Sequence, residues 1–76
     1  MITTREIEEL GFVLDDKYHD KEQWLYELDN CALNVIFSDY GKTVKLEIYE
    51  SGYTASIELK GEVTIERVTN LIKALQ

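Results

Sequence analysis

The sequence lacks proline, and cysteine, histidine, methionine and tryptophan each occur once among its 76 residues. Because Cys31 is the single thiol, no disulfide can form within the chain, and a free thiol in so short a chain favours a reducing compartment. No run approaches the roughly 18 apolar residues that span a bilayer, and no apolar stretch of leader length follows the opening Met. We therefore expect a cytoplasmic protein. Without a proline-rich, repetitive or low-complexity linker, residues 1–76 should form a single α+β domain.

Basic residues are also scarce. The chain has 8 Lys and Arg against 15 Asp and Glu, which gives a formal net charge of −7. Neutralisation of phosphates by clustered basic side chains supplies most nucleic-acid affinity, so direct binding to DNA or RNA is not expected. The acidity is typical of a soluble surface, and it allows a basic or neutral protein partner. An acidic decoy that occupies the nucleic-acid groove of another protein is a variant of this idea.

Two segments carry helical signals. Thr3 and Glu6 have the spacing of a capping box, which predicts a short helix over residues 3–10. Near the end of the chain the apolar period is again helical and Thr64 can serve as N-cap, which predicts a second helix over 65–75. The apolar stripe of this second helix consists of Ile65, Val68, Leu71, Ile72 and Leu75.

Between residues 23 and 60 the apolar period changes to two, as in half-buried β-strands. Paired residues must point to the same side of a sheet, so each connection must contain an even number of residues. Two-residue turns at 30–31, 40–41 and 51–52 satisfy this condition, as do four-residue versions of each turn. The side chains expected to face the core are Trp24, Tyr26, Leu28, Leu33, Val35, Phe37, Val44, Leu46, Ile48, Tyr53, Ala55, Ile57 and Leu59.

The shorter turns define a register for the strands. The pairs expected on the core face are Leu28 with Leu33, Phe37 with Val44, and Ile48 with Ala55. On the other face Lys45 lies opposite Glu58, an opposite-charge pair of the kind that stabilises a sheet. Val13 and Leu14 could begin a further short strand, ahead of a loop. The predicted fold is thus α+β in the order α-β-β-β-β-α, a four-stranded antiparallel meander with both helices packed on one face.

Groups that could carry chemistry are few. The potential metal ligands that cluster in one loop are Asp15, Asp16, His19, Asp20 and Glu22. Their spacing matches no known metal-binding loop, and Lys17 and Lys21 lower the local negative potential. His19 has no visible proton partner, and Cys31 is close to Asp29, which disfavours the thiolate. No phosphate-binding loop, nucleophile elbow or paired-histidine motif occurs, so we expect neither an enzyme nor a cofactor.

Apolar residues also occur on the face of the sheet that points away from the predicted core. Leu25, Ile36 and Tyr49 alternate there with polar residues, and Leu25 and Ile36 are expected to be direct neighbours. We predict that this outward face, or alternatively an edge strand of the sheet, contacts another protein chain, with a homodimer as one option. The predicted contact residues are Leu25, Ile36, Tyr49, Glu27, Lys45, Glu47 and Glu58.

The two ends of the chain carry the remaining pattern. The opening Thr-Thr-Arg-Glu-Ile-Glu-Glu-Leu-Gly-Phe and the closing Thr-Ile-Glu-Arg-Val-Thr-Asn-Leu-Ile-Lys-Ala-Leu flank the four predicted strands. In this arrangement, over nearly its whole length, the sequence resembles small uncharacterised proteins encoded by phages and other mobile elements of bacteria. Such families have no agreed activity, so the resemblance implies no site residues. The expected function is a non-enzymatic protein-interaction, accessory or regulatory module, and the alternative is a small metal- or ligand-binding domain using the acidic loop 15–22.

Overall fold

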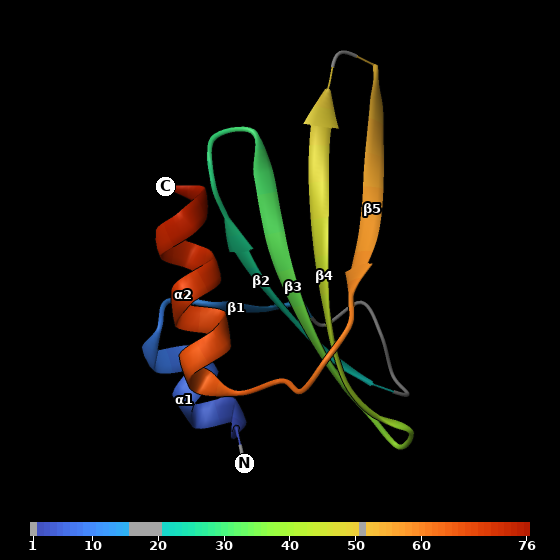
Figure 1. The fold of residues 1–76 in the computed structure, drawn as a ribbon. Coiled ribbons are helices and arrows are strands. Elements are labelled where there is room, and N and C mark those ends of the chain that lie inside the picture. The colour runs from blue at the N-terminus through green and yellow to red at the C-terminus, as the bar shows by residue number, and fades with distance from the viewer. Residues whose placement is uncertain (1, 16–20, 51) are drawn as a thin grey trace.

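The computed structural model describes residues 2–15, 21–50 and 52–76. Its elements are α1 (Thr4–Glu9), β1 (Val13–Asp15), β2 (Glu22–Glu27), β3 (Cys31–Ser38), β4 (Gly41–Glu50), β5 (Tyr53–Leu59) and α2 (Ile65–Leu75). The five strands form one antiparallel sheet in which they are ordered as in the chain (Figure 1). The predicted α+β class and antiparallel meander are confirmed.

The sheet has five strands, so the prediction of four is wrong. The additional strand, β1, begins at Val13, where the sequence allows a further short strand. It has three residues, and Val13 lies opposite Leu25 of β2. The Val13 side chain is 69% exposed. With so little burial, the sequence of β1 shows no alternation of core and surface positions, and the strand is held by its backbone hydrogen bonds to β2.

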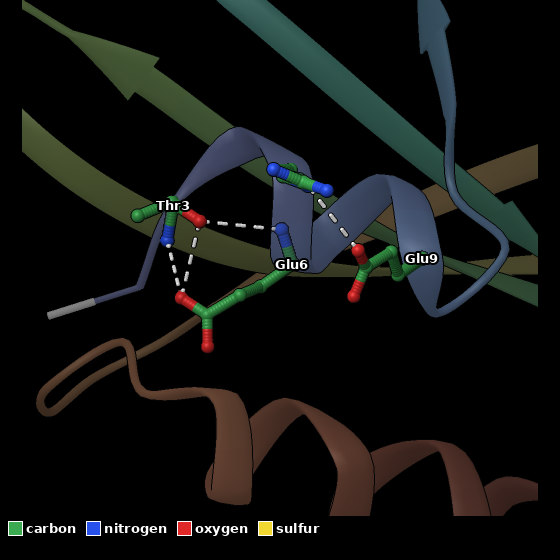
Figure 2. Close-up of polar contacts among 4 residues, drawn as sticks. Thr3, Glu6 and Glu9 are labelled. Atoms are coloured by element: carbon green, nitrogen blue, oxygen red, sulfur yellow. Dashed lines mark hydrogen bonds and ion pairs between the residues drawn. The ribbon is translucent and has the colours of Figure 1, made fainter.

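The first helix begins at the predicted capping box. The Thr3 hydroxyl accepts a hydrogen bond from the backbone N–H of Glu6 at 3.2 Å, and the Glu6 carboxylate accepts one from the backbone N–H of Thr3 at 3.0 Å (Figure 2). Gly11 follows the helix with a φ of 108°, which glycine adopts without strain. The chain then turns back, so that the N–H of Phe12 donates to the carbonyl of Ile7 and both side chains are buried.

The second helix covers the predicted residues. The Thr64 hydroxyl accepts a hydrogen bond from the backbone N–H of Arg67 at 3.1 Å, as an N-cap does. The Arg67 guanidinium also donates to the backbone carbonyls of Lys60 and Glu62. These bonds tie the connection between β5 and α2 to the first turn of the helix.

The hairpin formed by β4 and β5 has the predicted register. Lys45 lies opposite Glu58 on the outward face, and Ile48 lies opposite Ala55 on the other. The two opposite charges therefore take their predicted cross-strand positions.

The hairpin formed by β2 and β3 is displaced by two residues from the predicted register. Tyr26, rather than Leu28, lies opposite Leu33. The turn falls on residues 29–30, since the N–H of Leu28 donates to the carbonyl of Cys31 at 2.8 Å. Asp and Asn favour turn positions because their side chains bond to nearby backbone, which explains why the turn moves onto them.

The hairpin formed by β3 and β4 is displaced in the same way. Val35, rather than Phe37, lies opposite Val44, and the turn falls on residues 39–40. Gly41, with a φ of 125°, follows this turn instead of lying within it, as in hairpins whose turn residues keep negative φ. Because each displacement is by two residues, every side chain stays on its predicted face.

The core lies on the face of the sheet that we call the inner face, which carries Trp24, Val35 and Val44. Both helices contribute to it. Its buried residues are Ile2, Ile7, Phe12, Trp24, Leu33, Val35, Val44, Val68 and Ile72. Burial of these side chains supplies the main stabilising free energy of so small a domain.

The helices cover only part of the inner face, in contrast to the predicted packing. The six residues of α1 and the eleven of α2 extend about 9 and 16 Å, whereas the ten residues of β4 extend about 34 Å. Figure 1 shows both helices at the β2 side of the sheet, with β5 at the opposite side. Tyr53 and Ile57 of β5 are accordingly 62% and 47% exposed although they belong to the inner face.

Candidate functional site

The predicted contact residues lie on the outward face, but not in the predicted arrangement. Leu25 lies opposite Asn34, and Ile36 lies opposite Gln23 and Thr43. Leu25 and Ile36 are therefore diagonal rather than direct neighbours, because the β2–β3 register differs from the predicted one by two residues. The prediction that Leu25 and Ile36 are direct neighbours is therefore wrong.

The three apolar residues of the outward face do not form one patch. Ile36 is 9% exposed and Tyr49 is 40% exposed. Tyr49 is six residues further along β4 than Thr43, the neighbour of Ile36, which separates the two side chains by about 20 Å. Only Tyr49 of this pair offers apolar surface to a partner. The role of the outward face as a contact surface stays a prediction.

A polar ladder occupies the middle of the outward face. Asn34 is 1% exposed, and its side chain accepts a hydrogen bond from the Gln23 amide at 2.9 Å. The Asn34 amide donates in turn to a carboxylate oxygen of Glu47. The ladder crosses three strands and satisfies a polar group that would otherwise be costly to bury. The ladder was not predicted from the sequence, although an Asn in mid-strand between alternating apolar residues is a signal that could have indicated it.

The charged contact residues differ in exposure. Glu27 and Glu58 are exposed, whereas Lys45 and Glu47 are half-buried. Lys45 and Glu58 line a hollow of about 440 Å³ on the outward face, together with Ile36 and Thr43 and the turn residues 38–40. Cations, carboxylates and hydroxyls are mixed there, and no one ligand chemistry is favoured.

Among the described residues, Tyr49 is the one whose side-chain pKa is clearly displaced from its ordinary value. Burial raises the pKa of the Tyr49 phenol above its ordinary value of 10.0, and the negative charges of Glu47 and Glu27 and the nearby Cys31 raise it further. The phenol therefore remains protonated at neutral pH, where it can donate a hydrogen bond but cannot act as a base.

A group of neighbouring apolar residues is exposed on the inner face beyond the helices. We call this region the uncovered inner surface and define it as Tyr53, Ala55 and Ile57 of β5 with Ile48 of β4. Ile48 lies opposite Ala55, and both are half-buried. These positions were predicted to lie in the core. The lengths of the helices, set by their caps, are the signal that could have shown that they remain uncovered.

The uncovered inner surface adjoins an open edge of the sheet. β5 is the last strand in the sheet order, and in the described ranges no further strand follows it. Its seven residues contain a single charged side chain, Glu58, and no proline. Open edges are sites at which another strand can add, and natural sheets usually guard them with charges, proline or bulges. Here the edge carries little such protection.

The residues considered for chemistry are only partly described. Asp16, His19 and Asp20 of the predicted acidic loop lie outside the described residues. Across ranges 2–15, 21–50 and 52–76, no three His, Cys, Asp or Glu side chains are grouped so as to hold a metal ion. Cys31 is half-buried and forms no disulfide.

Comparison with protein-family models, with curated proteins and with solved structures gives no match for this chain. Among the described residues no helix has the length and apolarity needed to cross a membrane. The surfaces described above are therefore the basis on which a function can be proposed.

Proposed function

We propose that this chain is a non-enzymatic protein-interaction module that binds another protein chain along β5. The observation that carries the proposal is the exposure of Tyr53 and Ile57, at 62% and 47%, beside an open strand edge. Exposed apolar residues that are contiguous mark a contact site more often than scattered ones do, and these two lie on one face of one strand. The module would act as an accessory or regulatory factor in the cytoplasm, as the single thiol and the resemblance to mobile-element proteins indicate.

The edge and the uncovered inner surface support one mode of binding. A strand added beside β5 would form backbone hydrogen bonds along the edge, and its inward side chains would pack beside Tyr53, Ala55 and Ile57. The backbone contacts supply affinity and the apolar contacts supply specificity. The predicted outward residues, Tyr49 above all, would then lie on the opposite side of the same sheet and form a second contact face.

Affinity capture with two variants tests the proposal. Ile57→Lys places a charge in the uncovered inner surface, whereas Asn70→Lys adds the same charge at an exposed site on α2. Wild-type protein and Asn70→Lys should recover the same stoichiometric protein partner, or self-associate, and Ile57→Lys should do neither. Circular dichroism checks that both variants are folded. Equal recovery by all three proteins, or no partner and no self-association with any of them, would refute the proposed function.

A further inference from the structure

If another copy of the chain pairs with the open edge of β5, it can do so through one of its own two edge strands, β1 or β5. β1, the other edge strand, has three residues and offers a short ladder. Pairing of β5 with β1 of another copy would be heterologous and would continue into an open chain of molecules. Pairing of β5 with β5 is isologous and closes after two copies. Of the two, only the second uses the full seven residues on both sides.

We propose, resting on the function proposed above, that the partner is a second copy of this chain. The two copies pair through antiparallel β5 strands about a two-fold axis perpendicular to the sheet and form a continuous ten-stranded sheet. The inner faces of both copies lie on the same side of that sheet. The two uncovered inner surfaces then meet at the axis.

The length of β5 selects the register. In a two-fold antiparallel pair, the residue numbers of any two opposed residues add up to the same sum. This sum must be even if side chains of the inner face are to lie opposite side chains of the inner face. With Ser56 opposite its own copy, Tyr53 lies opposite Leu59 and all seven residues of each strand are paired. Ile57 then lies opposite Ala55, so a large side chain meets a small one. Any other symmetric register leaves residues of β5 unpaired.

The charges along the edge favour the same register. Glu58 is the one charged residue in β5, and a register centred on Ser56 places it opposite the uncharged Thr54 of the second copy. A register centred on Glu58 would place two carboxylates opposite each other, which destabilises a strand pair. The register centred on Ser56 thus keeps the two Glu58 carboxylates from facing each other.

The acidity of the whole molecule distinguishes a second copy from a basic partner. Each copy carries a net charge of −7, so two copies repel one another at long range. Salt screens this repulsion over a Debye length of about 8 Å at physiological ionic strength. Self-association should therefore strengthen as salt is added, whereas binding of a basic partner should weaken.

The position of the helices leaves room for the second copy. Figure 1 shows β5 at the side of the sheet opposite α1 and α2. The described residues place no helix beyond β5, since the sheet order ends with that strand and α2 contributes to the core through Val68 and Ile72. The two β5 edges can approach without displacing an element of either copy.

Charge changes at Thr54 test the register directly. Thr54 is exposed on the outward face, so its substitution leaves the core intact. Thr54→Lys would place a cation opposite Glu58 of the second copy twice in the dimer, and the dissociation constant should fall roughly two- to thirtyfold. Thr54→Glu should raise it by a similar factor, and adding Glu58→Lys to Thr54→Glu should restore it.

Sedimentation of the purified full chain over its soluble concentration range measures these constants. Asn70→Lys and Asn70→Glu make the same charge changes on α2 and correct for the general effect of net charge. The proposal is supported if the Thr54 variants change the dissociation constant in opposite directions and beyond the Asn70 controls, with rescue by Glu58→Lys. A dimer that responds equally to both positions would overturn the β5 pairing.

A monomer at every soluble concentration and salt condition would also overturn the second copy as partner. The proposed function would still stand in that case if affinity capture recovered a different protein in a manner that depends on Ile57. Failure of both measurements would remove both proposals. Affinity capture and sedimentation together thus distinguish a failure of the proposed interaction function from a failure of the proposed self-association.

Discussion

The side-chain amide of Asn34 donates a hydrogen bond to the carboxylate of Glu47, diagonally across β3 and β4 on the face away from the helices. The Asn34 oxygen is in turn bonded to Gln23 of β2. A buried polar side chain in the central strand is thus satisfied from both neighbouring strands. Removing one partner should therefore leave a desolvated group behind.

A double-mutant cycle should show this coupling. Asn34→Ala and Glu47→Ala are each expected to destabilise the protein, and the double variant should be less destabilised than the sum by about 1 kcal/mol. Denaturant unfolding of the four proteins measures the difference. Additivity within about 0.3 kcal/mol would show that the hydrogen bond contributes nothing net to stability.

The inner face should respond differently at its two ends. Leu33 is fully buried, so Leu33→Ala should cost about 2–5 kcal/mol through lost burial and the cavity left behind. Ile57 lies on the same face but is half exposed, so Ile57→Ala should cost less than about 1 kcal/mol in the monomer. Unfolding at protein concentrations low enough to avoid self-association decides this. Equal costs would mean that something in the folded monomer covers β5.

The N-cap of α2 should contribute measurably to stability. Thr64→Ala removes the acceptor for the Arg67 N–H and is expected to cost about 1 kcal/mol. Thr64→Ser keeps a hydroxyl and serves as the matched control, with little change expected. Thermal and denaturant midpoints report both variants. A Ser variant as unstable as the Ala variant would assign the effect to packing of the Thr methyl group instead.

The titration of Tyr49 should be displaced to high pH. The difference between the alkaline titrations of wild type and Tyr49→Phe, followed by phenolate absorbance, should have a midpoint above 10.0. Glu47→Gln should move this midpoint downward, because one negative charge beside the phenol is removed. A midpoint at or below 10.0 would contradict the effect of partial burial and of the neighbouring negative charges on this phenol.

The same shift has a definite consequence for stability. The folded state holds the Tyr49 proton more tightly than the unfolded state does, because its pKa is raised on folding. The contribution of Tyr49 to stability is therefore complete below the unfolded pKa, near 10, and is lost as the pH rises through the folded pKa. Tyr49→Phe should accordingly reduce the loss of stability above this pH.

Patterns that depend on local chemistry could be predicted from the sequence. The cap at Thr3, the cap at Thr64 and the period-two strands fix the helices and the faces, because each depends on residues close together in the chain. The β4–β5 register could also be predicted. The other two registers could not, since parity permits several turns and the choice depends on Asp and Asn conformations at the turn itself.

Features that depend on long-range geometry could not be predicted from the pattern of apolar and polar residues in the sequence. β1 is held by backbone pairing and buries little, so the sequence indicates only that a short strand could begin at Val13 and Leu14, and not that it joins the sheet. The uncovered inner surface has the same alternation as true core, and Ile57 is exposed because both helices are short and lie at the β2 side of the sheet, away from β5. Tyr49 and Ile36 share a face in the sequence pattern, whereas their separation along the sheet follows from the register.

The meander topology of the sheet also governs the order in which the molecule can form. Every strand pairs with the strand next to it in the chain, so each pairing closes a short loop and can form early at low entropic cost. Ile7 of α1 and Val68 of α2 meet in the core only when the two ends of the chain come together. Hairpins should therefore appear first, with docking of the terminal helices as the late step of folding. Substitutions in the β3–β4 hairpin should slow folding, and those at Ile7 or Val68 should mainly speed unfolding.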